Sequence, residues 1–259
     1  MAEPAMVGAS TGALLGGRVR LRQPAVGYRV AIDPVLLSAA IPAVDGETVL
    51  DVGAGVGGAA LCLAARVPGL RVVGLEMQRE LARLAAENVI DNALDDRVDI
   101  LIGDLKRPPP RLGPRSFDHV LANPPYQQAE RGNPSPNRLK AASNVEGEAK
   151  LADWLAFCLT MVKSGGTVTV IHRADRLPEI LAGLTERTGG LVVFPIWPRD
   201  PAYAPDVVAK RVIVQARVGS RAPMRLLGGL IVHDADGKYT EAAETVLRHA
   251  GALVLDGQG

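Results

Sequence analysis

Aromatic residues and cysteines are scarce in this sequence. Phe, Trp and Tyr together make up 3% of its 259 residues, and only two cysteines occur, Cys62 and Cys158. They do not form a CxxC pair, so the sequence predicts neither a disulfide framework nor a zinc knuckle. We expect both cysteines to be reduced and packed in the core of a cytoplasmic protein.

Signals for a membrane segment or a metal are also lacking. The start, MAEPAMVGASTGALLGG, has no basic region and no sustained apolar run, so no signal peptide is predicted. The least charged long stretch, residues 49–65, contains an aspartate and many glycines. We expect it to form a strand, a turn and a helix instead of a membrane span. The four histidines have no metal-ligand spacing, so no metal site is expected.

Segments of strand length alternate with segments of helix length from residue 47 onward. We expect strands at residues 47–53, 70–76, 97–104, 117–125 and 166–172. This alternation predicts an α/β fold with a doubly wound, parallel sheet. Two further β-rich segments, 191–197 and 207–219, are joined without room for a crossover helix, so we expect them to pair antiparallel. The prediction is a mostly parallel seven-stranded sheet with an antiparallel strand near the C-terminus, the layout of class I methyltransferases.

Three parts are predicted along the chain. Residues 1–45 precede the first regular strand and are expected to form a leader. Residues 46–220 carry the alternating sheet. Residues 221–259 have the pattern of a short strand, a turn and a final helix, which we expect to pack on the core as an addition.

A glycine-rich turn follows the first regular strand. Its sequence, LDVGAGVGG, contains Gly53, Gly55, Gly57 and Gly58. Glycines are needed where a backbone turns tightly and approaches a ligand closely. The spacing satisfies G-x-G-x-x-G, and Glu76 ends the second strand, so this stretch alone is compatible with a dinucleotide site.

Two further acids favour S-adenosylmethionine as the ligand. Asp51 precedes Gly53 by two residues, which gives the D-x-G-x-G pattern of methyltransferases. Asp104 ends the third strand, where such enzymes contact the adenine amino group, although a turn residue is the competing interpretation. Three neighbouring strand ends therefore carry acids at the edge of the sheet where ligands bind.

The fourth strand ends in Asn123, Pro124, Pro125 and Tyr126. An exocyclic or amide nitrogen is a poor nucleophile because its lone pair is delocalised. The Asn123 side-chain oxygen and the Pro124 carbonyl could accept its two N–H bonds and stabilise the positive charge that develops during transfer. The fixed φ of consecutive prolines would hold that carbonyl still. Tyr126 offers a flat face on which a planar substrate can stack. The motif predicts methylation of a nitrogen.

With these motifs the chain resembles the NPPY group of class I S-adenosylmethionine-dependent methyltransferases. More closely, it is similar to the bacterial tRNA1(Val) adenine-N6-methyltransferase family, which modifies position 37 beside the anticodon. The resemblance covers nearly the whole chain, including the leader segment GGRVRLRQPAVGYRVAIDPVLLSAAIP, the basic segment AKRVIVQARVGSRAP and the tail IVHDADGKYTEAAETVLR.

The resemblance implies further cofactor contacts. In similar enzymes the leader folds over the methionine end of the cofactor, which would place Tyr28, Arg29 and Asp33 near that pocket. Met77 and Leu105, which follow the acids of the second and third strands, are assigned to the same pocket. Asn123 is counted both there and among the catalytic residues. Asp33 and Pro34 also have the pattern of a helix start, with Asp33 as the N-cap.

The basic residues suggest an RNA surface. The net charge of +1 is uninformative, but seven basic residues against two acidic ones lie between Lys106 and Lys140. Solvated basic loops are common, so the assignment of single residues is weak. The candidate RNA contacts are Arg131, Arg138, Lys140, Lys210 and Arg211.

The predicted function is N6-methylation of an adenine in RNA, at position 37 of the tRNA(Val) anticodon loop. A single-stranded loop base needs little unpairing energy, so a compact enzyme could take it. One alternative is glutamine-N5 methylation of release factors, although such enzymes carry a helical domain before the methyltransferase fold. Another alternative is a non-catalytic partner subunit that binds S-adenosylmethionine.

Overall fold

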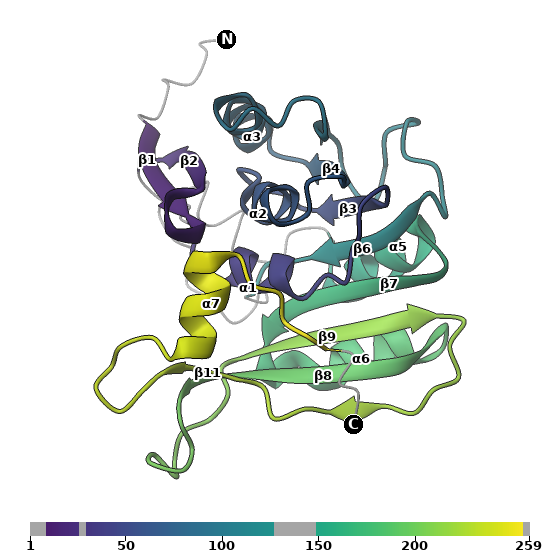
Figure 1. Cartoon of the computed structure of the whole chain (residues 1–259). Helices are drawn as coiled ribbons and strands as arrows, with labels where there is room; N and C mark the ends of the chain where they lie inside the picture. Colours follow the sequence, from purple (N-terminus) through teal and green to yellow (C-terminus); the bar gives the residue numbers. More distant parts are fainter. Residues whose placement is uncertain (1–8, 26–29, 127–148, 256–259) are drawn as a thin grey trace.

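A single nine-stranded sheet with helices on both faces forms the body of the protein (Figure 1). The structure is a computed structural model, and it describes residues 9–25, 30–126 and 149–255. The strands are β1 (Ala9–Leu14), β2 (Val19–Pro24), β3 (Thr48–Val52), β4 (Arg71–Glu76), β5 (Val98–Ile102), β6 (Phe117–Ala122), β7 (Val162–Arg173), β8 (Thr188–Arg199), β9 (Arg211–Val218), β10 (Arg225–Leu226) and β11 (Leu230–His233). The helices are η1 (Leu15–Gly17), α1 (Asp33–Ala39), α2 (Gly58–Arg66), α3 (Arg79–Asp91), α5 (Leu151–Met161), η2 (Ala174–Arg176), α6 (Leu177–Thr185) and α7 (Glu241–His249).

The strand order confirms the predicted fold class. It runs β10-β8-β9-β7-β6-β3-β4-β5, and all neighbours from β7 to β5 are parallel. β9 is antiparallel to both β7 and β8, between which it lies. The seven expected strands are all present. Two short strands that the sequence suggested as one, β10 and β11, add to the edge beside β8, and both pair parallel to it.

The parallel strands place their carboxyl ends along one edge of the sheet. The register pairs Val52 of β3 with Leu75 of β4 and with Ala122 of β6. Glu76 of β4 pairs with Ile102 of β5. The residues that follow β3, β4, β5 and β6 therefore lie side by side, as strand ends do in sheets that bind ligands at this edge.

The first strands form a separate two-stranded sheet that packs on α3. β1 and β2 pair antiparallel as a hairpin. Asn88 of α3 exchanges hydrogen bonds with the backbone of Arg22, which donates at 2.6 Å and accepts at 2.9 Å. Asn92, one turn later, does the same with Arg20 at 2.8 and 2.7 Å. The two amides bond alternate residues of β2. They therefore satisfy backbone groups that an edge strand would otherwise expose.

The leader and the C-terminal residues share one hydrophobic core with the central sheet. Leu36 of α1, Leu61 of α2 and Leu247 of α7 belong to the same cluster of buried side chains. The backbone of Leu253 donates to the carbonyl of Ala39 at 2.8 Å, and the guanidinium of Arg18 donates to the carbonyl of Arg248 at 3.1 Å. The division into leader, methyltransferase unit and addition stays a prediction.

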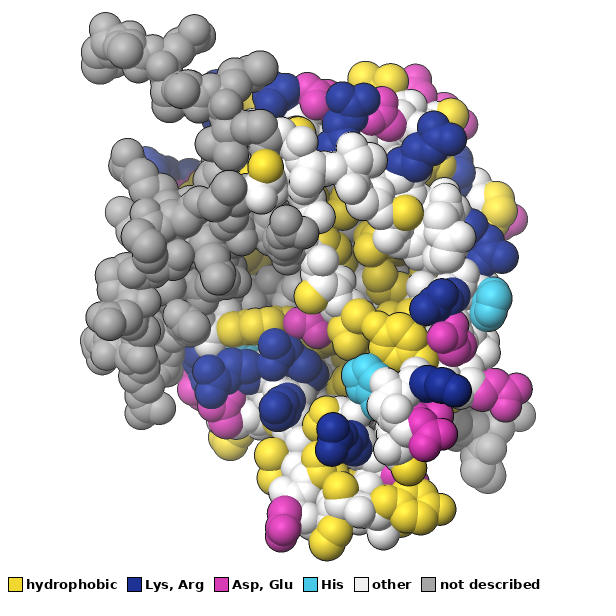
Figure 2. All heavy atoms as spheres, turned by 90° about the vertical axis from the view of Figure 1, so that its left-hand side faces the viewer, with side chains coloured by type: hydrophobic (Ala, Val, Ile, Leu, Met, Phe, Trp, Pro, Cys, Tyr) yellow, Lys and Arg dark blue, Asp and Glu magenta, His cyan; other side chains and the backbone are white. Residues whose placement is uncertain are grey.

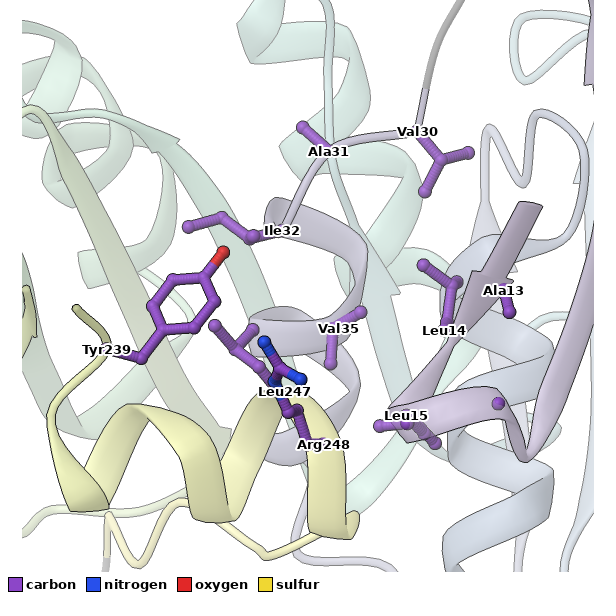
Figure 3. A pocket seen from close by; sticks show the side chains of 12 residues that line it. Ala13, Leu14, Leu15, Val30, Ala31, Ile32, Val35, Tyr239, Leu247 and Arg248 are labelled. Carbon is purple, nitrogen blue, oxygen red and sulfur yellow. The ribbon is translucent and has the colours of Figure 1, made fainter.

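A pocket of about 460 Å³ lies between the hairpin, α1 and α7 (Figure 3). Its walls are mostly apolar, with Leu14 and Leu15 on one side and Ile32 and Val35 on another. Tyr239 and Arg248 bring the polar atoms from the C-terminal side. No helix within the described residues is long and apolar enough to cross a membrane.

Candidate active site

Acidic side chains lie at the carboxyl ends of β3 and β4 and in the turn after β5, as the sequence predicts. Asp51 is 3% exposed and Glu76 is 6% exposed, whereas Asp104 is partly exposed in the turn after β5. Asp104 accepts a hydrogen bond from the backbone of Lys106 at 2.9 Å, so it also shapes its own turn. The two interpretations of Asp104 are compatible.

The glycine-rich turn adopts a backbone that other residues tolerate poorly. Gly53, Gly55 and Gly57 all have positive φ, at 73°, 58° and 87°. A Cβ on Gly53 would lie 2.4 Å from the indole of Trp154. The backbone N–H of Gly53 bonds the carbonyl of Leu75 at 2.8 Å, which ties the turn to β4. The turn is therefore held close to the sheet in a backbone conformation that glycine adopts readily.

Glu76 is fixed by backbone donors on both of its oxygens. One oxygen accepts from Gly55 at 2.8 Å and the other from Gln78 at 2.7 Å. Burial raises the pKa of Glu76, while these hydrogen bonds oppose the shift. A carboxylate oxygen has more than one lone pair, so Glu76 retains capacity to accept from the two hydroxyls of a ribose.

Asp51 lies beneath the glycine-rich turn. Its side chain accepts from the backbone of Ala60, in the first turn of α2, at 3.2 Å. Burial raises the pKa of Asp51 to about 7; the bond from Ala60 opposes the shift, and the nearby Glu76 adds to it. Two buried acids close together favour a cationic ligand, because a positive charge would relieve their mutual repulsion. S-adenosylmethionine carries such charges.

Met77 and Leu105 lie beside the acids of β4 and β5. The Met77 side chain belongs to the exposed hydrophobic residues, with 61% of its surface accessible. Leu105 is partly buried against the core. An exposed methionine beside Glu76 offers an apolar surface for a flat base. These positions fit the nucleoside part of S-adenosylmethionine, and their assignment as contacts stays a prediction.

Asn123 follows β6 with an orphaned side-chain oxygen. Its Oδ1 atom is buried, and it has no hydrogen-bond partner among the residues that the structure describes. Buried polar atoms without a partner are uncommon and costly, so each needs an explanation. An acceptor in this state is suited to receive an N–H group from a ligand.

His172, near the end of β7, contacts the same segment, although the sequence does not predict it as a site residue. Its Nδ1 accepts from the backbone of Arg173 at 2.8 Å, so the hydrogen is on Nε2, which lies 3.3 Å from the Pro125 carbonyl. Burial lowers the pKa of His172 to about 4, although the bond to Pro125 opposes the shift. The ring is neutral at physiological pH. A histidine at a strand end was the only signal in the sequence.

Tyr126 is contacted by two residues for which the sequence suggested other roles. Its hydroxyl donates to the Asp33 carboxylate at 2.6 Å, and the Arg211 guanidinium lies 4.4 Å from its ring centroid. Arg211 also donates to Asp33 at 3.1 Å. Asp33 is the first residue of α1 and Ile32 holds the N-cap position, so the expected capping role of Asp33 is wrong. The carboxylate faces Tyr126 and Arg211 instead.

Five predicted site residues lie outside the described residues: Tyr28, Arg29, Arg131, Arg138 and Lys140. Lys210 is exposed and directly precedes β9. Figure 2 views the side of the molecule towards which β3, β4 and β6 point, and it shows Lys and Arg side chains gathered below a central group of hydrophobic ones. Within the described residues, no group of three or more His, Cys, Asp or Glu could hold a metal ion.

Comparisons with known proteins find similarity to methyltransferases. Residues 29–141 match the family model of the methyltransferase small domain. A tRNA1(Val) (adenine(37)-N6)-methyltransferase from Aeromonas hydrophila is 27% identical over 82% of this chain and 86% of its own length. A protein of the same name from Porphyromonas gingivalis is 28% identical over 86% of this chain and 88% of its own length.

Solved structures share the fold. A crystal structure of a predicted O-methyltransferase from Agrobacterium tumefaciens superposes with a TM-score of 0.70, at 27% identity, over 85% of this chain and 98% of that one. A second, an S-adenosylmethionine-dependent O-methyltransferase from Thermotoga maritima, has a TM-score of 0.52 at 18% identity over 76% of this chain and 68% of that one. The latter similarity supports the fold alone.

Proposed function

We propose that this chain, whose residues 29–141 match the methyltransferase small domain, methylates N6 of an adenine in RNA with S-adenosylmethionine as the methyl donor. The proposed target is the adenine at position 37 of the tRNA(Val) anticodon loop. This choice rests on the names of the relatives from Aeromonas hydrophila and Porphyromonas gingivalis. The cofactor supplies an electrophilic methyl group on a sulfonium.

The buried Asn123 oxygen, which has no hydrogen-bond partner within residues 9–25, 30–126 and 149–255, carries this proposal. An exocyclic amino group has two N–H bonds, and Asn123 Oδ1 with the Pro124 carbonyl offers two acceptors in neighbouring residues. Accepting both hydrogens draws the nitrogen towards sp³ geometry and aims its lone pair at the methyl carbon. The N–C bond forms as the C–S bond breaks, and the nitrogen then releases one proton. Both acceptors stabilise the positive charge that develops on nitrogen.

The same observation favours nitrogen over oxygen as the methylated atom. A hydroxyl group has only one hydrogen to donate, so one of the two acceptors would stay unsatisfied in an O-methyltransferase. The choice of adenine instead of a glutamine amide as the substrate is supported by the names of the relatives. The basic side chains on the face that holds the carboxyl strand ends (Figure 2) suit a polyanion.

The test is transfer of tritiated methyl groups from S-adenosylmethionine to bulk tRNA, followed by mass spectrometry of the nucleosides. We expect N6-methyladenosine from the wild-type protein. The Asn123→Ala variant should lose at least about 10²-fold in rate, because one preorganised acceptor is gone. Its affinity for S-adenosylhomocysteine should stay within about twofold of wild type.

Three outcomes would contradict the proposal. Methylation of a release-factor glutamine but not of RNA would favour the protein substrate. Cofactor binding without transfer to RNA or protein would favour a non-catalytic subunit. Loss of cofactor binding in Asn123→Ala would show that Asn123 belongs to the cofactor pocket and does not act on the nitrogen.

A further inference from the structure

The geometry points to a positioning role for Asp33, His172 and Arg211, which we call the Tyr126 frame. We infer that these three residues fix the Tyr126 ring before a base arrives, so that only one ring face is offered for stacking. This inference rests on the proposed function. It gives Asp33 and Arg211 roles other than the cofactor and RNA contacts that the sequence suggested.

The hydroxyl end of Tyr126 is held by a carboxylate. Asp33 accepts the phenolic hydrogen at 2.6 Å, and the side chain of Asp33 is only 11% exposed. Burial, together with this acceptor, raises the pKa of Tyr126 well above its usual value. The phenol therefore stays protonated and keeps donating, which fixes the direction of the ring axis.

One face of the ring is covered by a cation. The Arg211 guanidinium carbon lies 4.4 Å from the ring centroid, within cation–π range. The same guanidinium donates to Asp33 at 3.1 Å, so the three groups close a triangle. Burial alone would lower the pKa of Arg211, but Asp33 raises it above its usual value. The cation is held by groups of this chain and is not a free partner for phosphate.

The third contact acts on the ring edge and on the backbone. The His172 ring lies 5.1 Å from the Tyr126 ring, centroid to centroid, at 70°. Its Nε2–H donates to the carbonyl of Pro125, the residue directly before Tyr126. His172 has no exposed surface, so it cannot swing away without opening the core. It fixes the peptide that carries the tyrosine.

The three frame residues come from separate elements. Asp33 begins α1, His172 lies near the end of β7 and Arg211 begins β9. The strand register places Arg211 opposite Arg173, directly after His172. Because the guanidinium covers one face, the target base has only the opposite face for stacking. A misplaced ring would misalign the amino group relative to Asn123 and lower the rate of transfer.

Arg211→Ala and Arg211→Lys distinguish the frame from a phosphate contact. For a positioning residue we expect kcat with tRNA to fall about 10- to 100-fold in Arg211→Ala. KM and its dependence on salt should stay close to wild type. Lysine keeps the charge but loses the planar stack, so Arg211→Lys should also lower kcat. A phosphate contact predicts a raised KM, a shallower salt dependence and near-normal activity in Arg211→Lys, and that result would overturn the inference.

A spectroscopic readout tests the frame without any activity. The sequence has four tyrosines, so 3-fluorotyrosine labelling gives few 19F resonances, and Tyr126→Phe assigns the one of interest. We expect that resonance to shift in Asp33→Asn, Arg211→Lys and His172→Gln. Arg83→Ala removes an exposed ion pair on α3 and is the matched control, with no shift expected.

The two readouts separate the possible failures. If the wild-type protein transfers no methyl group to RNA, the proposed function fails, while the 19F comparison still decides whether the frame holds Tyr126. If the Tyr126 resonance is the same in wild type and all three variants, the inference is wrong even where transfer to RNA occurs.

Discussion

Buried ionisable groups distinguish the residues of this site from those of an ordinary sheet edge. Asp51 and Glu76 are both almost fully buried, and burial raises the pKa of each. Side chains with strongly shifted pKa values at the ligand-binding edge of a sheet are typical of functional sites. Here they give the cofactor pocket a property that can be measured by changing pH.

We predict that cofactor affinity falls with acidification below pH 7. The pKa of Asp51 is about 7 in the folded chain, and a cationic ligand favours the ionised form. Below that pKa binding requires release of a proton, so the affinity should drop by up to about tenfold per pH unit. Calorimetric titration with S-adenosylmethionine from pH 5.5 to 8.5 measures this. Asp51→Asn should bind more weakly with a flatter profile, and an equally steep profile in that variant would assign the titration to another group.

The sequence predicted some residues of the site and missed the contacts among others. Asp51 and Glu76 lie at the carboxyl ends of β3 and β4, Asn123 directly follows β6, and parallel pairing alone brings them together. By contrast, Asp33 contacts Tyr126, which lies 93 positions later in the sequence, and Arg211, which lies 178 positions later. Their meeting depends on where α1 packs and on the register of β9, which no local pattern specifies. His172 was missed for the same reason.

At the scale of elements, two asparagines of α3 hold the hairpin β1–β2, and one of them is more deeply buried than the other. Asn88 is fully buried, and its amide also donates to the carbonyl of Val56 in the glycine-rich turn at 2.9 Å. It therefore joins β2, α3 and the turn through three hydrogen bonds. Asn92 makes the corresponding pair with Arg20 in a more exposed position. The sequence predicted the helix but gave no signal for this attachment.

We predict a larger loss of stability from Asn88→Ala than from Asn92→Ala. Removing the buried amide leaves backbone groups of Arg22 and Val56 without partners, which should cost on the order of 3 kcal/mol. The backbone groups of Arg20 that bond Asn92 are more exposed and can bond to water instead, so the loss of Asn92 should cost about 1 kcal/mol. Urea unfolding of both variants gives the comparison. Equal costs would mean that the hairpin contributes little through Asn88.

At the scale of the whole molecule, the net charge does not describe the local charge of one face. The net charge is only +1. Lys and Arg side chains nevertheless gather on the face that holds the carboxyl ends of the parallel strands (Figure 2). A local basic surface attracts a polyanion even when the whole chain is nearly neutral.

We predict that binding of tRNA weakens steeply with salt while cofactor binding does not. Release of counterions from the RNA should lower its affinity by at least about tenfold between 50 and 200 mM salt. Fluorescence anisotropy with labelled tRNA and calorimetry with S-adenosylhomocysteine measure the two in parallel. An RNA affinity that is independent of salt would argue against a basic docking face.

The position of β9 has a consequence for synthesis of the chain. β9 is made after β8 but inserts between β8 and β7, so β8 cannot join the sheet until the ribosome has released residues 211–218. A domain generally folds as a unit, so the sheet closes only after β9 has emerged. Tyr126 acquires its guanidinium partner only when this late strand inserts. A nascent chain that stops before β9 therefore lacks an ordered place for the target base.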